Sequence, residues 1–281
     1  MGGSIAYLLL LTLLFLNPLV KLAMYAARNE FYSHILLAPF ISGYLLYIRR
    51  RMFSCDYRTS LRGAIPMVTI GVAAFTVGIL YRKTLSFNDC LTLAMLALVT
   101  LIAAGGFLFL GSKWMAAAAF PLGFLVFMIP IPDAAVNCLE NGLSHASAEA
   151  AAMFFSLCGT PMARDGTVFE LPGITIRVAQ ECSGIHSSLV LFISSLLASH
   201  LFLRTTWRRA VLVAFVIPLG ILRNGFRILV IGLFCVHVGP QMIDSPVHHH
   251  GGPLFFALSL IPMFLLLWYL RREEQPRNLP G

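Results

Sequence analysis

Apolar residues occur in this chain as long, unbroken runs separated by short polar segments. Several runs approach the roughly 20 residues that a helix needs to cross the hydrocarbon core of a bilayer. They predict eight membrane-spanning helices, near residues 4–24, 31–48, 64–81, 90–110, 114–131, 183–203, 210–236 and 252–270. A membrane β-barrel is excluded, because barrel strands alternate apolar and polar residues and these runs do not.

Composition supports the same interpretation. The 281 residues are 58% hydrophobic and only 11% charged, whereas about a quarter of the residues in a typical soluble domain are charged. No stretch between the runs exceeds about 50 residues, which leaves no room for a separate water-soluble domain of ordinary size. We therefore predict one all-α polytopic membrane domain that covers residues 1–281.

The basic excess, a formal charge of +8, is concentrated in short loops. This distribution indicates membrane topology and argues against nucleic acid as a partner. Loops on one side carry Arg49, Arg50, Arg51, Arg58, Arg62, Lys113, Arg204, Arg208, Arg209, Arg271, Arg272 and Arg277. Because basic loops stay on the cytoplasmic side, both termini are predicted to be cytoplasmic. Arg82 and Lys83 do not fit this orientation.

Under this orientation, the two longest segments between spans, 132–182 and 237–251, lie on the extracytoplasmic face. Residues 134–157 are alanine-rich but too polar to cross a bilayer, so we predict an interfacial helix there. The alternating stretch 167–178, with Pro172-Gly173 near its centre, predicts a short hairpin. This hairpin would lead to Cys182 at the outer end of the sixth span.

Cys182 is the candidate nucleophile. It precedes a predicted helix start and has the small neighbours Ser183 and Gly184, and the positive end of a helix dipole favours a reactive thiolate. The alternative is a packing cysteine in an apolar environment, which is our interpretation of the other five. None of the six cysteines has CxxC or paired spacing, so we expect no disulfide framework.

Arg223 and Arg227 are four residues apart in the seventh apolar run, so they share one helix face. An arginine at the centre of a membrane helix costs roughly 2.5–3.5 kcal/mol on translocon scales, so two need a partner, water or a function. They could snorkel to the interface or pair with a carboxylate such as Glu181. They could also form part of a site, with Asn224 and Gly225 between them allowing another backbone to approach.

His248, His249 and His250 precede the eighth span. Adjacent side chains in an extended loop point in opposite directions, and no HxxxH or HExxH spacing accompanies them, so we expect no metal ion and no other cofactor. One of the three is a candidate proton carrier. If the eighth span begins early, His248 shares a face with Gly252 and Phe256, where Gly252 would allow close helix approach; in an extended loop, His248 and His250 share a side.

These candidates converge on one membrane face. A thiol, an imidazole and a guanidinium together suit acyl transfer, in which the thiolate attacks a peptide carbonyl, the histidine moves the proton and the arginine stabilises the developing charge. The alternative is a transporter or binding protein whose arginine pair holds an anionic substrate. Many transporters are built from inverted repeats, and no internal repeat is visible in this sequence.

The sequence resembles the exosortase and archaeosortase family. The family's cysteine motif resembles residues 179–185 (AQECSGI), its NxxRI motif resembles residues 224–228 (NGFRI), and its HxxxGxxxF pattern fits His248, Gly252 and Phe256. Similarity also extends over Ser33-His34, residues 127–132, Gly159-Thr160-Pro161 and Leu171-Pro172-Gly173. A histidine in the third motif resembles the bacterial exosortase branch.

This resemblance implies a cysteine protease or transpeptidase in the bacterial inner membrane. Its substrates would be exported proteins with C-terminal sorting signals, each made of a PEP-CTERM-like Pro-Glu-Pro motif, a transmembrane helix and a basic tail. Cleavage would occur at the outer face through a thioester, which water or an amine acceptor then resolves. The resemblance implies Cys182 as nucleophile, Arg227 as the motif arginine and His248 as general base or acid. His249 and His250 remain alternatives to His248, and Arg223 matches no catalytic position.

Overall fold

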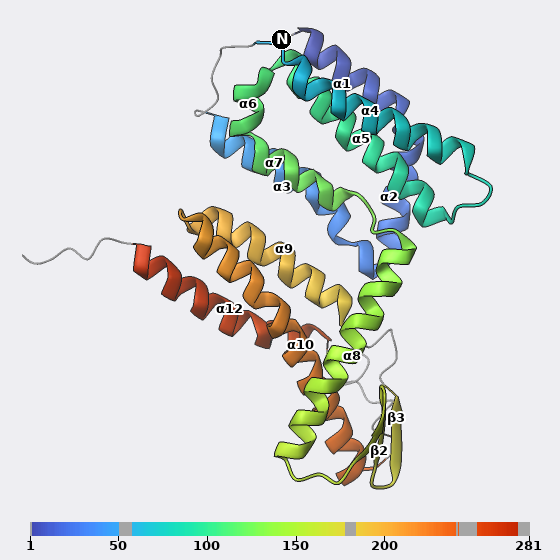
Figure 1. Cartoon of the computed structure of the whole chain (residues 1–281), viewed down its shortest axis with the longest axis vertical. Helices are drawn as coiled ribbons and strands as arrows, with labels where there is room; N and C mark the ends of the chain where they lie inside the picture. The colour runs from blue at the N-terminus through green and yellow to red at the C-terminus, as the bar shows by residue number, and fades with distance from the viewer. Residues whose placement is uncertain (1, 51–57, 178–183, 240, 242–251, 275–281) are drawn as a thin grey trace, which may run out of the picture. The chain divides into compact units, whose positions relative to one another are not determined.

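The computed structural model describes residues 2–50, 58–177, 184–239, 241 and 252–274, and Figure 1 shows the arrangement of its elements. The protein is an all-α polytopic membrane protein, as predicted. Six of the described helices are long and apolar enough to cross a membrane, and up to eight spans result if each of two bent helix pairs forms one. The chain divides into two compact units, Met1–Val136 and Asn137–Gly281.

The first unit is a bundle of helices. It contains α1 (Gly2–Leu14), α2 (Leu16–Arg28), the 3₁₀ helix η1 (Glu30–Tyr32), α3 (His34–Arg49), α4 (Leu61–Leu80), α5 (Phe87–Phe109), α6 (Gly111–Ala117), α7 (Ala119–Phe124) and the 3₁₀ helix η3 (Leu125–Met128). Within this unit α5 packs against α1 and α4, and α3 packs against α7 (Figure 1). The start of α5 is fixed by Ser86, whose hydroxyl accepts a hydrogen bond from the Asp89 N–H, as expected of an N-cap.

Two predicted spans are broken rather than straight. The predicted span 4–24 is α1 and α2, bent by 63°, and the predicted span 114–131 is α6 followed by α7 and η3, bent by 70°. Pro18 and Pro121 explain both breaks, because proline lacks the N–H that would bond to the carbonyl four residues earlier. Those carbonyls belong to the last residues of α1 and α6, where each helix ends.

The second unit combines helices with a small sheet. It contains most of α8 (Asp133–Leu157), the strands β1 (Ala163–Asp165), β2 (Val168–Leu171) and β3 (Ile174–Arg177), and the helices α9 (Ile185–Phe202), α10 (Thr206–His237) and α12 (Gly252–Glu274). The helices α9, α10 and α12 pack against one another (Figure 1). The predicted hairpin is present as β2 and β3, and the short strand β1 adds a third antiparallel strand.

The sheet and α8 share an apolar core with the second half of α10. Phe155 of α8 and Phe169 of β2 are fully buried in this core, with ring centroids 5.7 Å apart. Gly232 of α10 lies against them, because a methyl group added there would come within 2.6 Å of the Phe155 ring. Residues 134–157 therefore form the predicted helix, and one of its faces is buried protein core.

Candidate functional site

The structure describes only part of the predicted site. Arg223, Asn224 and Arg227 all lie on α10. Cys182 and Glu181 lie outside the described residues, as do His248, His249 and His250. The geometry available is therefore that of α10 and of the elements that contact it.

Gly184, two residues after Cys182 in the sequence, packs directly on the arginine motif. It is the N-cap of α9 and has a left-handed backbone with φ of +69°, a conformation that favours glycine. A methyl group at Gly184 would come within 2.9 Å of Asn224 Oδ1 and 3.1 Å of Arg223 Nη2. Glycine is thus required here both by backbone conformation and by the close approach of α10.

Arg223 holds the first turn of α9. Its Nη2 donates to the backbone oxygen of Gly184 at 3.3 Å and to the Ser188 hydroxyl at 3.2 Å. The side chain is only 8% exposed, so Arg223 does not snorkel to an interface. Its Nη1 is buried and has no hydrogen-bond partner in the part of the chain that the structure describes. Arg223 is therefore a structural link with unused hydrogen-bonding capacity.

Arg227 differs in exposure from Arg223 and Asn224. Asn224 is 2% exposed, and Arg227, one turn further along α10, is half-buried. The same-face prediction for the two arginines agrees with the helix geometry of α10, yet only Arg223 is fully enclosed. Gly225 lies on the buried side between them.

A third helix, α8, reaches this part of α10. A methyl group at Gly225 would come within 2.6 Å of Ala150 Cβ and 3.0 Å of the Ala151 backbone nitrogen, so the two helices touch through backbone and small side chains. On the same helix, Ser144 and Ser147 are buried, and their hydroxyls have no partner among the described residues.

Sequence reasoning missed this buried face of α8. The polar residues at 137, 140, 141, 145 and 149 dominated the interpretation of residues 134–157 as an interfacial helix. The signal that could have revealed the face is the spacing of small residues at steps of three and four, which is typical of close helix packing in membranes. Those residues are Ser144, Ser147, Ala148 and Ala151.

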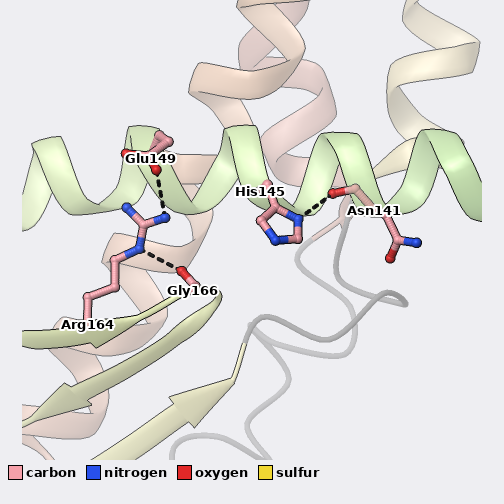
Figure 2. Close-up of polar contacts among 5 residues, drawn as sticks. All are labelled: Asn141, His145, Glu149, Arg164 and Gly166. Atoms are coloured by element: carbon pink, nitrogen blue, oxygen red, sulfur yellow. Dashed lines mark hydrogen bonds and ion pairs between the residues drawn. The ribbon is translucent and has the colours of Figure 1, made fainter.

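An exposed face of α8 carries polar contacts (Figure 2). His145 Nδ1 donates to the backbone oxygen of Asn141 at 2.8 Å. Glu149 accepts a hydrogen bond from Arg164 Nη2 at 2.9 Å, and Arg164 Nε donates to the Gly166 backbone oxygen at 2.7 Å. The hydrogen bond from Arg164, with its charge, lowers the pKa of the Glu149 carboxyl. These contacts connect the sheet to α8.

Two expectations, that no metal ion is bound and that a helix approaches closely at Gly252, concern in part the described residues. No group of three or more His, Cys, Asp or Glu side chains suited to a metal ion occurs among them, and the three consecutive histidines are not part of that set. The described structure shows no close helix contact at Gly252, the first residue of α12, since a methyl group added there would meet no described atom within 4 Å. The predicted approach toward Cys182 concerns residues outside the described ranges, so it stays a prediction.

Comparison with known protein families identifies the chain. A family model described as transmembrane exosortase (Exosortase_EpsH) matches residues 26–265, which is well over half of the sequence. The chain belongs to the transmembrane exosortase family. The matched region of this exosortase includes α8, α9 and α10, together with the three sequence motifs. Searches of curated proteins and of solved structures gave no match.

Proposed function

We propose that this exosortase is a membrane-embedded cysteine transpeptidase that cleaves PEP-CTERM-like C-terminal sorting signals of exported proteins. Family membership implies a protease or transpeptidase role and a protein substrate with a sorting signal. The observation that carries the assignment of residues is the packing of Gly184 against Arg223 and Asn224. It joins the end of the cysteine motif to the start of the arginine motif.

Chain geometry limits how far the nucleophile can be from this contact. Two residues of extended chain span at most about 7 Å, so the Cα of Cys182 falls within that distance of Gly184. Arg227 then acts as the guanidinium that stabilises the oxyanion, because its fixed donors suit a carbonyl oxygen that gains charge. His248 is the proton carrier, with His249 and His250 as alternatives.

The reaction follows from these roles. His248 takes the proton of the Cys182 thiol, and the sulfur attacks the scissile carbonyl carbon to form a tetrahedral oxyanion. The C–N bond then breaks, the histidine returns its proton to the departing amine, and a thioester remains. Water or an amine attacks the thioester and restores the thiol. Positive-inside charge puts this chemistry at the outer face of the inner membrane, with both termini cytoplasmic.

Replacement of the nucleophile tests the proposal. Cys182→Ala should abolish cleavage of a reporter that carries a sorting signal, whereas Cys158→Ala, which removes an exposed cysteine, should leave cleavage unchanged. Mass spectrometry of the wild-type enzyme with reporter should detect a thioester on Cys182. Full cleavage by Cys182→Ala would refute the mechanism and would favour the alternative of an arginine pair that only binds an anionic substrate.

A further inference from the structure

Arg223 and Arg209, both on α10, bind opposite ends of α9. Arg223 Nη2 donates to the backbone oxygen of Gly184, directly before the first residue of α9, at 3.3 Å. Arg209 Nε and Nη2 donate to the backbone oxygen of Leu203, directly after the last residue of α9, at 2.9 and 2.7 Å. The two helices pack against each other between these contacts (Figure 1). The two arginines therefore help to set the position of α9 along α10.

The contact at the first turn of α9 involves several bonds. The Gly184 oxygen also accepts from the Ser188 N–H at 2.9 Å and from the Ser187 hydroxyl at 3.1 Å. Arg223 Nη2 also donates to the Ser188 hydroxyl at 3.2 Å. A methyl group at Gly220 of α10 would come within 2.9 Å of that same hydroxyl oxygen. Arg223 thus binds a turn of α9 that is packed closely on α10.

This turn connects two groups of the proposed reaction. Cys182, the proposed nucleophile, is two residues before Gly184, so the two Cα atoms lie within about 7 Å of each other. Arg227, which we assign to the oxyanion, is four residues after Arg223 on α10, about 6 Å along the helix axis. Arg223 therefore links the segment that leads to the thiol with the helix that carries the second guanidinium.

We infer that Arg223 is a positioning residue of the transpeptidase reaction. By binding the first turn of α9, it fixes the distance between the Cys182 thiol and the Arg227 guanidinium. The inference rests on the proposed function for the roles of these two groups. Arg223 acts through α9 rather than through contact with the substrate, since its side chain is only 8% exposed. Alignment matters because a displacement of about 1 Å between reacting groups can lower a rate by about a hundredfold.

A purely structural role is the alternative, and Arg209 provides the matched control for it. Arg223→Met and Arg209→Met each remove an arginine of α10 that binds a backbone oxygen at one end of α9. Both substitutions should lower thermal stability in detergent. Only Arg223→Met should lower kcat per folded molecule, by about a hundredfold, with the KM for a sorting-signal reporter within about twofold of wild type. The reason is that only Arg223→Met displaces groups that act in the transition state.

Milder substitutions at the same contact provide a second measurement. Arg223→Lys retains the charge but loses the planar fork of donors, so it should restore part of the activity and leave kcat about tenfold below wild type. Ser188→Ala deletes one of the two acceptors of Arg223 Nη2 and should lower kcat by about fivefold, equivalent to one hydrogen bond. Its control, Ser195→Ala, removes a hydroxyl that bonds to the Phe192 oxygen within α9 and should leave kcat unchanged.

A hundredfold lower kcat in Arg223→Met, with a wild-type kcat in Arg209→Met, supports the positioning role. A wild-type kcat per folded molecule in Arg223→Met, an equal loss in Arg209→Met, or a loss confined to KM overturns it. If Arg223→Met does not fold, a lower kcat in Ser188→Ala than in Ser195→Ala supports the role, and equal values overturn it. With an inactive Cys182→Ala enzyme, these negative results refute only the role of Arg223. Full cleavage by Cys182→Ala refutes the proposed function instead.

Discussion

The two units differ in whether their buried polar side chains have hydrogen-bond partners. In the first unit, Asn88 Nδ2 donates to the backbone oxygen of Ile131 at 2.8 Å and to Asp133 Oδ1 at 2.7 Å, and the Thr92 hydroxyl donates to the Pro130 oxygen at 3.0 Å. These bonds tie α5 to the segment that precedes α8 and to the first residue of α8. Among the described residues of this unit, Asn88 Oδ1 is the single buried side-chain atom without a partner.

The second unit leaves donors unused. Ser144 and Ser147 on α8 have buried hydroxyls without a hydrogen-bond partner among the described residues. Arg223 Nη1 on α10 is also buried and also lacks a partner among them. The two helices that carry these groups meet at Gly225. An unpaired polar group is costly away from water. The described part of the first unit thus pairs nearly all of its buried polar side-chain atoms, whereas the described part of the second unit leaves several without a partner.

The largest expected effect comes from separating α8 and α10. Gly225→Val places branched carbons where a single methyl already falls 2.6 Å from Ala150 Cβ, and we expect a destabilisation of about 3 kcal/mol and loss of cleavage. Thermal unfolding in detergent and a reporter cleavage assay measure both effects.

Gly142→Val on the exposed face of α8 is the matched control for this substitution. A methyl group there meets no described atom within 4 Å, so stability and cleavage should be unchanged. Wild-type stability and cleavage in Gly225→Val would show that the α8–α10 contact does not hold the site.

Removing one buried hydroxyl from each unit tests the same comparison between the two units, with smaller expected changes in stability and cleavage. Thr92→Val removes a bonded hydroxyl and should cost about 1–2 kcal/mol of unfolding free energy, with cleavage per folded molecule unchanged. Ser147→Ala removes a hydroxyl that has no partner among the described residues and should leave stability unchanged. If that hydroxyl serves the substrate, cleavage should fall by about fivefold, equivalent to one hydrogen bond. The reverse assignment of losses would contradict our view of the two units.

The sequence predicted the spans because apolar length alone decides whether a helix can cross a bilayer. It did not predict the breaks at Phe15 and Ala118, since run length carries no information on backbone direction. The positions of Pro18 and Pro121, three residues later, hold that information. The hairpin was predicted from alternation, but β1 has only three residues and is too short to show a period.

The candidate site was predictable only in part. Arg223 and Arg227 stand out in the sequence because charged residues are rare inside an apolar run. The contact between Gly184 and Asn224 joins residues 40 positions apart, and such a contact depends on how α9 packs on α10. The roles of Cys182 and His248 stay predictions.

The smallest expected effect concerns the exposed polar face of α8 in Figure 2. Arg164 lowers the pKa of the Glu149 carboxyl, and nearby His145 lowers it further. A carboxyl whose pKa is lower in the folded state stabilises the fold above its ordinary pKa, and this contribution disappears as the pH falls through the lowered value. Glu149 has a side chain that is 73% exposed, so solvent screening keeps the effect small. Glu149→Gln should therefore melt slightly below the wild type at pH 7, and the two melting temperatures should converge as the pH falls below the ordinary pKa of a glutamate. A difference that persists or grows in acid would show that the ion pair between Glu149 and Arg164 does not stabilise the contact of the sheet with α8.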